Sequence, residues 1–117
     1  MVDVTLMCAL VREGGVDVFP VDIDDRKTVG HLKEKITEKN YDITVPARKL
    51  QLFLAKKGDA WLNGAGAAAV TFDEHGTPQG FEQMDPLLWL KNAKYFGENF
   101  KPDEGEVHVL VVVPEGG

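Results

Sequence analysis

The segment of residues 49–57 alternates between two kinds of side chain, and this pattern strongly restricts the fold. A period of two is the repeat of a β-strand, whose successive side chains point to opposite faces. One face carries only leucines, and the other has Phe53 at its centre, which a solvent face would not favour. Lysines at both ends disfavour edge-to-edge pairing. The pattern predicts a strand with Leu52 and Leu54 in the core, and with Lys56 and Lys57 exposed and dispensable for stability.

The composition indicates one folded domain. With 117 residues, 44% of them hydrophobic, the chain can bury one core. The net charge of -6 argues against binding of nucleic acid by this domain, since phosphate binding needs clustered Lys and Arg. The single cysteine, Cys8, cannot form an internal disulfide and is expected to be a small core residue. No apolar run approaches the ~20 residues of a membrane span, and no signal peptide is visible.

The first forty residues follow a hairpin-then-helix pattern. Residues 2–11 are apolar on both faces, as in a central strand, and a Gly-Gly pair suits a tight turn. Residues 16–23 run back, and Pro20, which lacks an amide donor, places this second strand at an edge. Thr28 is a good N-cap for a helix from Val29 to about residue 40. Its apolar stripe comprises Val29, Leu32, Lys33 and Ile36.

Residues 63–106 are less regular. The Gly and Ala run at 64–68 is expected to be mobile, and residues 70–72 to form a short strand. Asp85-Pro86 is a good helix start, because proline fits the first helical position, so we expect an apolar helix from 86 to about 96. Its large apolar side chains should pack on the domain instead of extending as a free arm. Residues 106–113 then form the most β-prone stretch, apolar on both faces.

This order of elements predicts an α+β fold, a ubiquitin-like β-grasp. It has a mixed sheet, one crossing helix and a long helical insertion, at about 63–106, before the last strand. The first and last strands would pair in parallel at the centre. The chain resembles ubiquitin locally: Thr28-Val29 opens the helix, and a Val-His-Val-Leu strand comes last. We expect residues 1–114 to be one domain and 115–117 to be a tail or the start of a linker to a further domain.

A more specific resemblance is carried by several short matches in the right order, which cover nearly all of the chain. The chain resembles the N-terminal domain of Crinkler effectors, which contains an LFLAK motif. The matching segments are Leu50-Gln51-Leu52-Phe53-Leu54-Ala55-Lys56, Ala60-Trp61-Leu62, His108-Val109-Leu110-Val111-Val112-Val113-Pro114, Phe19-Pro20-Val21-Asp22-Ile23-Asp24 and Val29-Gly30-His31-Leu32-Lys33.

The resemblance implies a secreted effector whose N-terminal domain serves delivery or trafficking. Variable C-terminal effector domains then act inside the host cell, often in the host nucleus. We therefore expect a C-terminal effector domain of the same chain. The residues of the implied delivery motif are Leu50, Leu52, Phe53, Leu54, Ala55 and Lys56.

No catalytic pattern is recognisable, so we predict that this segment is not an enzyme and has no cofactor or metal. Serine is absent, and the three histidines share no metal-ligand spacing with Cys8 or an acidic pair. The Gly64-Ala65-Gly66 run lacks the strand, helix and lysine of a phosphate loop.

The alternative function is a protein-interaction module. His108 is expected on the outward side of the last strand, beside Leu110 and Phe53, whereas Val107, Val109 and Val111 face the helix. In ubiquitin the matching surface binds partners, so these residues with Trp89 form a candidate partner face for an unidentified host or secretory protein or a second copy. Against this, the insertion helix, with Leu88, Trp89 and Phe96, could bury the face, because large exposed apolar patches are uncommon in monomers. We favour burial.

The final Gly116-Gly117 pair also suits a conjugated ubiquitin-like modifier. Pro114 argues against it, because it stiffens the tail that a conjugating enzyme must thread. Burial of Leu52 to Lys56 separates the two main functions: a signal that is read in the folded state must be exposed.

Overall fold

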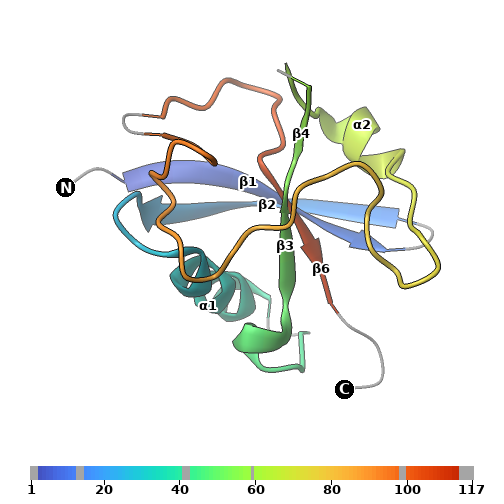
Figure 1. Cartoon of the computed structure of the whole chain (residues 1–117), viewed down its shortest axis with the longest axis horizontal. Coiled ribbons are helices and arrows are strands. Elements are labelled where there is room, and N and C mark those ends of the chain that lie inside the picture. The colour runs from blue at the N-terminus through green and yellow to red at the C-terminus, as the bar shows by residue number, and fades with distance from the viewer. Residues whose placement is uncertain (1–2, 13–14, 41–42, 59, 98–99, 114–117) are drawn as a thin grey trace.

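The sheet is mixed, and its strands lie in the order β2 (Gly15–Asp24), β1 (Asp3–Arg12), β6 (Val109–Val112) and β3 (Gln51–Leu54). The computed structural model describes residues 3–12, 15–40, 43–58, 60–97 and 100–113. Figure 1 shows the four strands crossing the centre of the molecule, with helix α1 (Val29–Lys39) on one side. The radius of gyration, 13.1 Å, is that of one domain of this length. Residues 115–117, predicted to be a tail or the start of a linker, lie outside the described residues.

The strand pairing of the predicted hairpin is confirmed, whereas its Gly-Gly turn lies partly outside the described residues. Strands β1 (Asp3–Arg12) and β2 (Gly15–Asp24) pair antiparallel along their whole length. Strand β6 (Val109–Val112) pairs with β1 in parallel and with β3 (Gln51–Leu54) antiparallel, so β1 and β6 are the central strands, as predicted. β2 lies at the edge of the sheet, the place where Pro20 is tolerated.

Helix α1 (Val29–Lys39) crosses one face of the sheet and begins as predicted. The hydroxyl of Thr28 accepts a hydrogen bond from the His31 N–H, and the His31 ring accepts one from the Thr28 N–H. This reciprocal cap satisfies donors that the first helical turn leaves open. The helix buries its predicted stripe of Val29, Leu32, Lys33 and Ile36. The short 3₁₀ helix η1 (Ala47–Lys49) then leads into β3.

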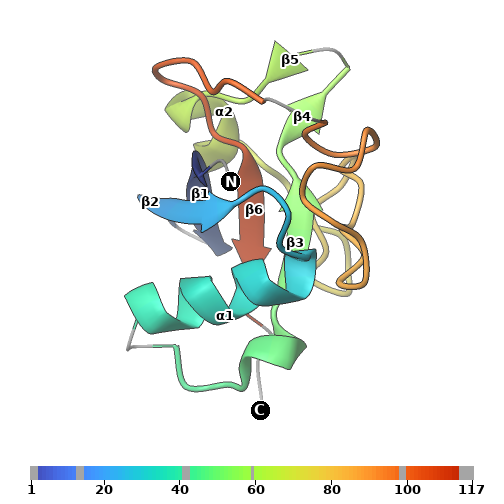
Figure 2. The same cartoon turned by 90° about the vertical axis from the view of Figure 1, so that its left-hand side faces the viewer.

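Two apolar clusters lie on opposite faces of the sheet. The main cluster fills the space between the sheet and α1. The smaller cluster covers the other face, where α2 (Gly64–Ala68) contributes Ala67. Figure 2 shows α1 and α2 on opposite sides of the strands. Because both faces are covered, the central strands are apolar on both sides.

Several segments between residues 56 and 72 differ from the prediction. Residues 64–68, expected to be mobile, form α2, because the Asn63 side chain accepts the Gly66 N–H and caps the helix. Residues 70–72 form no strand, and only Phe72 makes an isolated bridge, to Pro78. The opening strand is also interrupted, since β4 (Lys56–Lys57) leaves the sheet and pairs with β5 (Ala60–Trp61).

The predicted helix at 86–96 is wrong: that segment is a series of turns beside the start of α1. Its backbone forms short-range turn bonds, such as that from the Tyr95 N–H to the Asn92 carbonyl, and it also bonds to remote residues. The carbonyls of Pro86 and Leu88 accept the N–H groups of Gly30 and Val29, at 3.1 and 2.9 Å. The Leu90 N–H donates to the Lys27 carbonyl at 2.9 Å. These bonds satisfy open donors of the first turn of α1, which a separate helix could not do.

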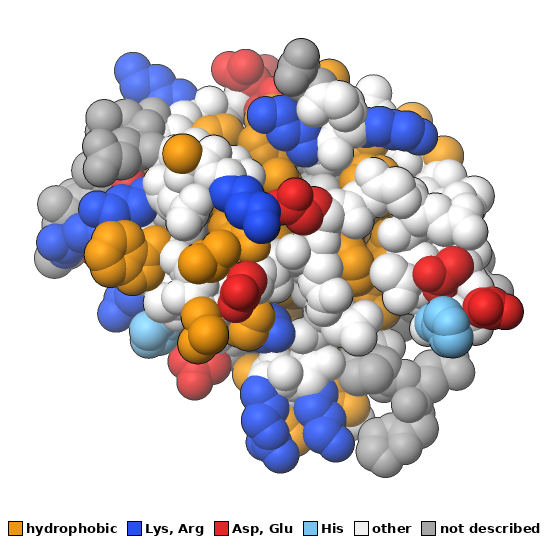
Figure 3. All heavy atoms as spheres, in the orientation of Figure 1, with side chains coloured by type: hydrophobic (Ala, Val, Ile, Leu, Met, Phe, Trp, Pro, Cys, Tyr) orange, Lys and Arg blue, Asp and Glu red, His pale blue; other side chains and the backbone are white. Residues whose placement is uncertain are grey.

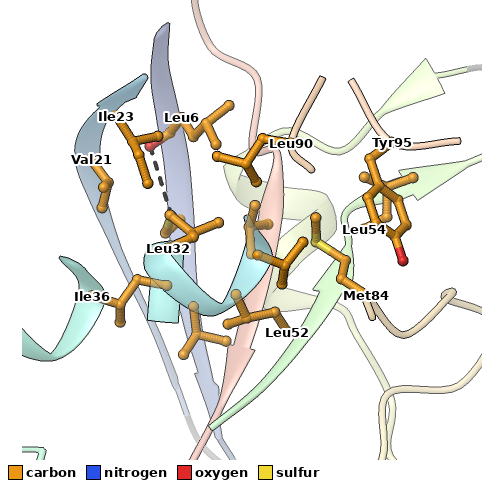
Figure 4. Close-up of a cluster of buried hydrophobic side chains, with 14 of the residues drawn as sticks. Leu6, Val21, Ile23, Leu32, Ile36, Leu52, Leu54, Met84, Leu90 and Tyr95 are labelled. Atoms are coloured by element: carbon orange, nitrogen blue, oxygen red, sulfur yellow. Dashed lines mark hydrogen bonds between the residues drawn. The ribbon is translucent and has the colours of Figure 1, made fainter. Parts of the chain in front are cut away.

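The expected packing of the insertion is confirmed for part of it. Leu90, Tyr95 and Met84 are buried in the main cluster, and Figure 4 shows them among its side chains. The Tyr95 hydroxyl accepts the Asp85 N–H at 2.6 Å and ties the two ends of the segment together. Leu87, in contrast, is 82% exposed. One side of the segment therefore belongs to the core and the other faces solvent.

Candidate functional site

The strand that carries the implied delivery motif is paired along both edges. On one side Leu52, Phe53 and Leu54 of β3 stand opposite Val111, Leu110 and Val109 of β6. On the other side, the Leu54 N–H donates to the Glu82 carbonyl at 2.9 Å, and the Met84 N–H donates to the Leu52 carbonyl at 2.8 Å. The insertion thus closes the edge that β3 would otherwise present, and it removes the backbone of the motif from contact with other chains.

The side chains of the motif are buried as well. Leu50, Leu52 and Leu54 belong to the cluster under α1, and Phe53 and Ala55 to the cluster on the other face. The alternation predicted from the sequence is therefore confirmed, and so is the core position of Leu52 and Leu54. In the folded domain these five side chains are not available to a receptor.

The basic end of the motif is the part that reaches solvent. Lys57 is exposed, as predicted, whereas Lys56 is half-buried. The Lys56 ammonium lies 5.3 Å from the centroid of the Trp61 ring, within the range of a cation–π contact. The β4–β5 hairpin holds the two side chains together, because Lys56 pairs with Trp61.

The candidate partner face is not an exposed surface in this fold. Phe53 and Leu110 do lie together, but both are buried beneath Ala67 of α2 and the partly buried Leu62, Val70, Phe72 and Phe81. Burial by the insertion was the favoured expectation, although Leu88 and Phe96 were expected to provide it. Those two side chains pack instead on the cluster under α1.

Trp89, the fourth residue of that candidate face, lies elsewhere. It forms an isolated bridge with Thr28 at the start of α1 and is 56% exposed. The Lys91 ammonium lies 5.2 Å from the centroid of its ring. Figure 3 shows exposed hydrophobic side chains scattered among charged ones on the face seen in Figure 1. The four proposed residues therefore do not form one site.

His108 lies just before β6, where it is fully buried and surrounded by aromatic rings. The Trp61 and Phe100 rings meet its imidazole edge-on, with centroids at 5.3 and 5.4 Å. Its Nδ1 accepts the Met7 N–H at 2.9 Å, so the ring proton is on Nε2, which lies 3.3 Å from the Glu106 carboxylate. The predicted alternation also fails here, since Val107 packs with Leu110 in the second cluster. Val107 bonds to Leu62 and precedes β6, so the period of the strand does not extend to it.

The environment of His108 favours the neutral ring. Burial lowers the pKa of His108 below its ordinary value, and the Glu106 carboxylate offsets only part of that shift. A proton on Nδ1 would also oppose the Met7 N–H, which needs an acceptor. His108 is thus a structural residue that joins the central strands, and it is not placed to exchange protons with a ligand.

We expect acidification to destabilise the domain through His108. Below about pH 6.5 the unfolded chain takes up a proton that the folded chain resists, so stability falls as the pH drops from there toward the folded pKa. The free energy of unfolding, measured with urea at about pH 7.5 and about pH 5.5, should decrease less in His108→Asn, which keeps an acceptor near Nδ1. His75→Asn is the control, because His75 is exposed and should leave the decrease unchanged. Equal decreases in wild type and His108→Asn would contradict this role.

No metal or nucleophile site emerges from the described part of the chain. No group of three or more potential ligands lies close enough together to hold a metal ion among these residues. Cys8 is buried, and desolvation raises the pKa of its thiol far above the ordinary range. A thiol held protonated is a poor nucleophile. Across the described ranges, no helix is long and apolar enough to cross a membrane.

Sequence reasoning missed a groove over β1 and β2, on the face opposite α1. It encloses about 550 Å³, and Thr5, Met7 and Val18 are among the residues that line it. Val18 is 42% exposed, whereas Leu110, on the same side of the sheet, is covered. The signal in the sequence was the apolar side chain of Val18 on the outward side of a strand already placed at the edge.

The geometry describes a small α+β domain whose most distinctive segment is a buried, doubly paired strand. Residues 4–112 match the model of the Crinkler effector protein N-terminal domain, and the chain belongs to this family.

Curated relatives support this assignment. The chain is 62% identical over 117 residues to Crinkler effector protein 4 of Phytophthora capsici, covering 99% of this chain and 27% of the relative. It is 36% identical over 115 residues to Crinkler effector protein 5 of Phytophthora infestans, with 95% and 33% covered. It is 31% identical over 115 residues to Crinkler effector protein 1 of Rhizophagus irregularis, with 96% and 22% covered. The chain thus spans a third or less of these relatives, and no solved structure matches it significantly.

Proposed function

We propose that this chain is the non-catalytic N-terminal delivery module of a secreted Crinkler-type effector. In this role it carries a C-terminal effector domain of the same protein into host cells, and the nucleus is the expected destination. The observation that carries the proposal is the family match over residues 4–112, in a chain that covers only 27% of a 62%-identical relative. A short module joined to a larger remainder, as in that relative, suits transport of a separate activity.

The proposed fold of the module is a ubiquitin-like β-grasp. Three observations support it: the strand order β2-β1-β6-β3, the parallel pairing of β1 with β6, and one helix crossing one face. A domain of this kind would act by binding a partner through its surface, and not by catalysis in a cleft.

Burial of the motif limits how delivery can operate. A receptor that meets the folded domain can contact Lys56 and Lys57 but not Leu52 or Leu54. The leucines therefore act in delivery either through the stability of the fold or in an unfolded chain. The first route predicts that loss of delivery follows loss of stability, whichever core residue is changed.

A secretion assay tests the proposal. The chain, preceded by a secretion signal and followed by one fragment of a split fluorescent reporter, is expressed in a Phytophthora strain that infects host tissue carrying the complementary fragment. We expect fluorescence inside host cells for the fusion and none for the secreted reporter fragment alone. A matched variant, Lys56→Ala with Lys57→Ala, asks whether the exposed end is read. Equal fluorescence with and without the chain would overturn the delivery function.

A further inference from the structure

We propose that the free edge of β2 and the adjoining groove bind an extended peptide with alternating apolar and basic side chains. The peptide would add a strand to the sheet beside β2 and reach into the groove. This surface is separate from the buried motif, so the inference goes beyond delivery and stands or fails independently of it.

The bonds of Met7 determine which backbone groups of β2 face outward. The Met7 N–H and carbonyl both bond to His108, at 2.9 and 2.8 Å, so they point toward β6 and away from β2. Met7 stands opposite Pro20, and in an antiparallel pair opposed residues exchange either both bonds or neither. Pro20 is therefore in a non-bonded pair, and every second residue of β2 from it is as well.

The outward groups accordingly belong to Val16, Val18 and Asp22, with the carbonyl of Pro20 between them. Within the described ranges, no hydrogen bond outside the β1–β2 pair reaches the backbone of these residues. The opposite edge of the sheet, along β3, is closed by Glu82 and Met84. β2 thus offers an unpaired row of donors and acceptors, the template that strand addition requires.

The groove beside this edge combines an apolar floor with acidic walls. Met7 and Val18 contribute to the floor, and Asp103, Glu104 and Glu106 belong to the loop that walls it. Asp103 and Glu104 are exposed. No Lys or Arg is among the described residues that line the groove. Electrostatic complementarity therefore favours a basic occupant.

The charge of β2 argues against a second copy of this chain as the occupant. Residues 15–24 contain three aspartates and no Lys or Arg. Pairing β2 with itself would offer no cross-strand pair of opposite charges, because neither strand carries Lys or Arg. A strand with Lys or Arg at alternate positions would instead pair opposite charges along the same edge.

Two synthetic peptides test the proposal with the 117-residue chain. One is a short acetylated peptide of alternating Val and Lys, and the other has Glu in place of Lys. We expect the Lys peptide to bind and to slow amide hydrogen exchange at Val16, Val18 and Asp22, measured by NMR. The amides of Phe19 and Val21, which already bond to β1, should change little. Equal binding of the Glu peptide, or protection elsewhere without these three amides, would overturn the proposal.

Variants locate the contact. Val18→Pro removes one outward donor at a position like that of Pro20 and should weaken binding roughly tenfold, the effect of about one hydrogen bond. Glu104→Lys, on the exposed loop, should weaken binding several-fold in a salt-dependent way. Glu38→Lys makes the same charge change at an exposed position of α1, away from the groove, and should not weaken binding. If Val18→Pro does not fold, the Glu104 and Glu38 pair still decides. Equal effects of these two charge variants, or dimerisation of the wild type through β2, would refute the proposal.

Discussion

Leu52→Ala is expected to lower the free energy of unfolding by about 2 to 5 kcal/mol, the range for deletion of a buried leucine side chain. Leu52 is 0% exposed and lies in the main cluster, between the sheet and α1. Its backbone is also held on both sides, by β6 and by Met84, so the site cannot readily collapse around the cavity. Urea unfolding followed by circular dichroism measures the change directly.

The control for this variant is Lys57→Ala at the exposed end of the same segment, where a change within about 0.5 kcal/mol is expected. Since a domain of this size has ~5 to 15 kcal/mol of stability in total, Leu52→Ala should remove a large part of it. If Leu52→Ala left unfolding unchanged while it abolished delivery, a receptor would be reading the leucine itself. Our account of the motif as core structure would then be wrong.

This result would change how the implied delivery motif is interpreted. A strand that is buried on both faces and paired on both edges tolerates few substitutions. Phe53 must fill the second cluster opposite Leu110, and Ala55 is fully buried, where a larger side chain would be crowded. These packing constraints hold with or without a receptor, so this sequence is expected in either case. Its occurrence therefore supports the fold and does not by itself establish recognition.

Local patterns were sufficient to predict the elements whose partners are set by their own periodicity. The stripe of α1, the cap at Thr28 and the edge position of β2 at Pro20 each depend on neighbouring residues or on one backbone group. The two central strands were predictable because apolar residues occupy both of their faces.

The insertion could not be predicted in the same way, because its structure depends on remote partners. Asp85-Pro86 suits both a helix start and a turn, and the Asp85 side chain indeed accepts the Leu87 N–H. What decides between them is the open donors at Val29 and Gly30, which bond to this segment. The groove was missed for a related reason, since Glu104 and Val18 line the same groove only once the chain has folded.

The insertion also explains why one sheet edge is closed and the other open. Glu82 and Met84 bond to β3 on the far side of the sheet from β2. The segment that protects the motif is thus continuous with the one that caps α1. A change that detached it would expose the β3 edge and uncap the helix together, so the two effects should appear as one cooperative loss.

Leu90→Ala is expected to cause such a loss, lowering the free energy of unfolding by about 2 to 5 kcal/mol. Leu90 is 0% exposed in the main cluster, and its N–H donates to Lys27 beside the start of α1. Figure 4 shows its side chain among those of the hairpin and α1. Amide hydrogen exchange should accelerate at Val29, Gly30 and Leu54. The N–H groups of these three residues bond to the insertion, and the bonds depend on its position against the core.

Leu87→Ala is the matched control, because it makes the same chemical change three positions earlier in the sequence. Leu87 is 82% exposed, so its loss should alter stability by no more than about 0.5 kcal/mol. The difference between the two variants then measures packing and not a general effect of leucine in this segment. Similar small effects of both would mean that residues 86–96 lie on the surface without supporting the core. The closure of β3 by the insertion would then have to depend on its own few hydrogen bonds, which net only ~1 kcal/mol each.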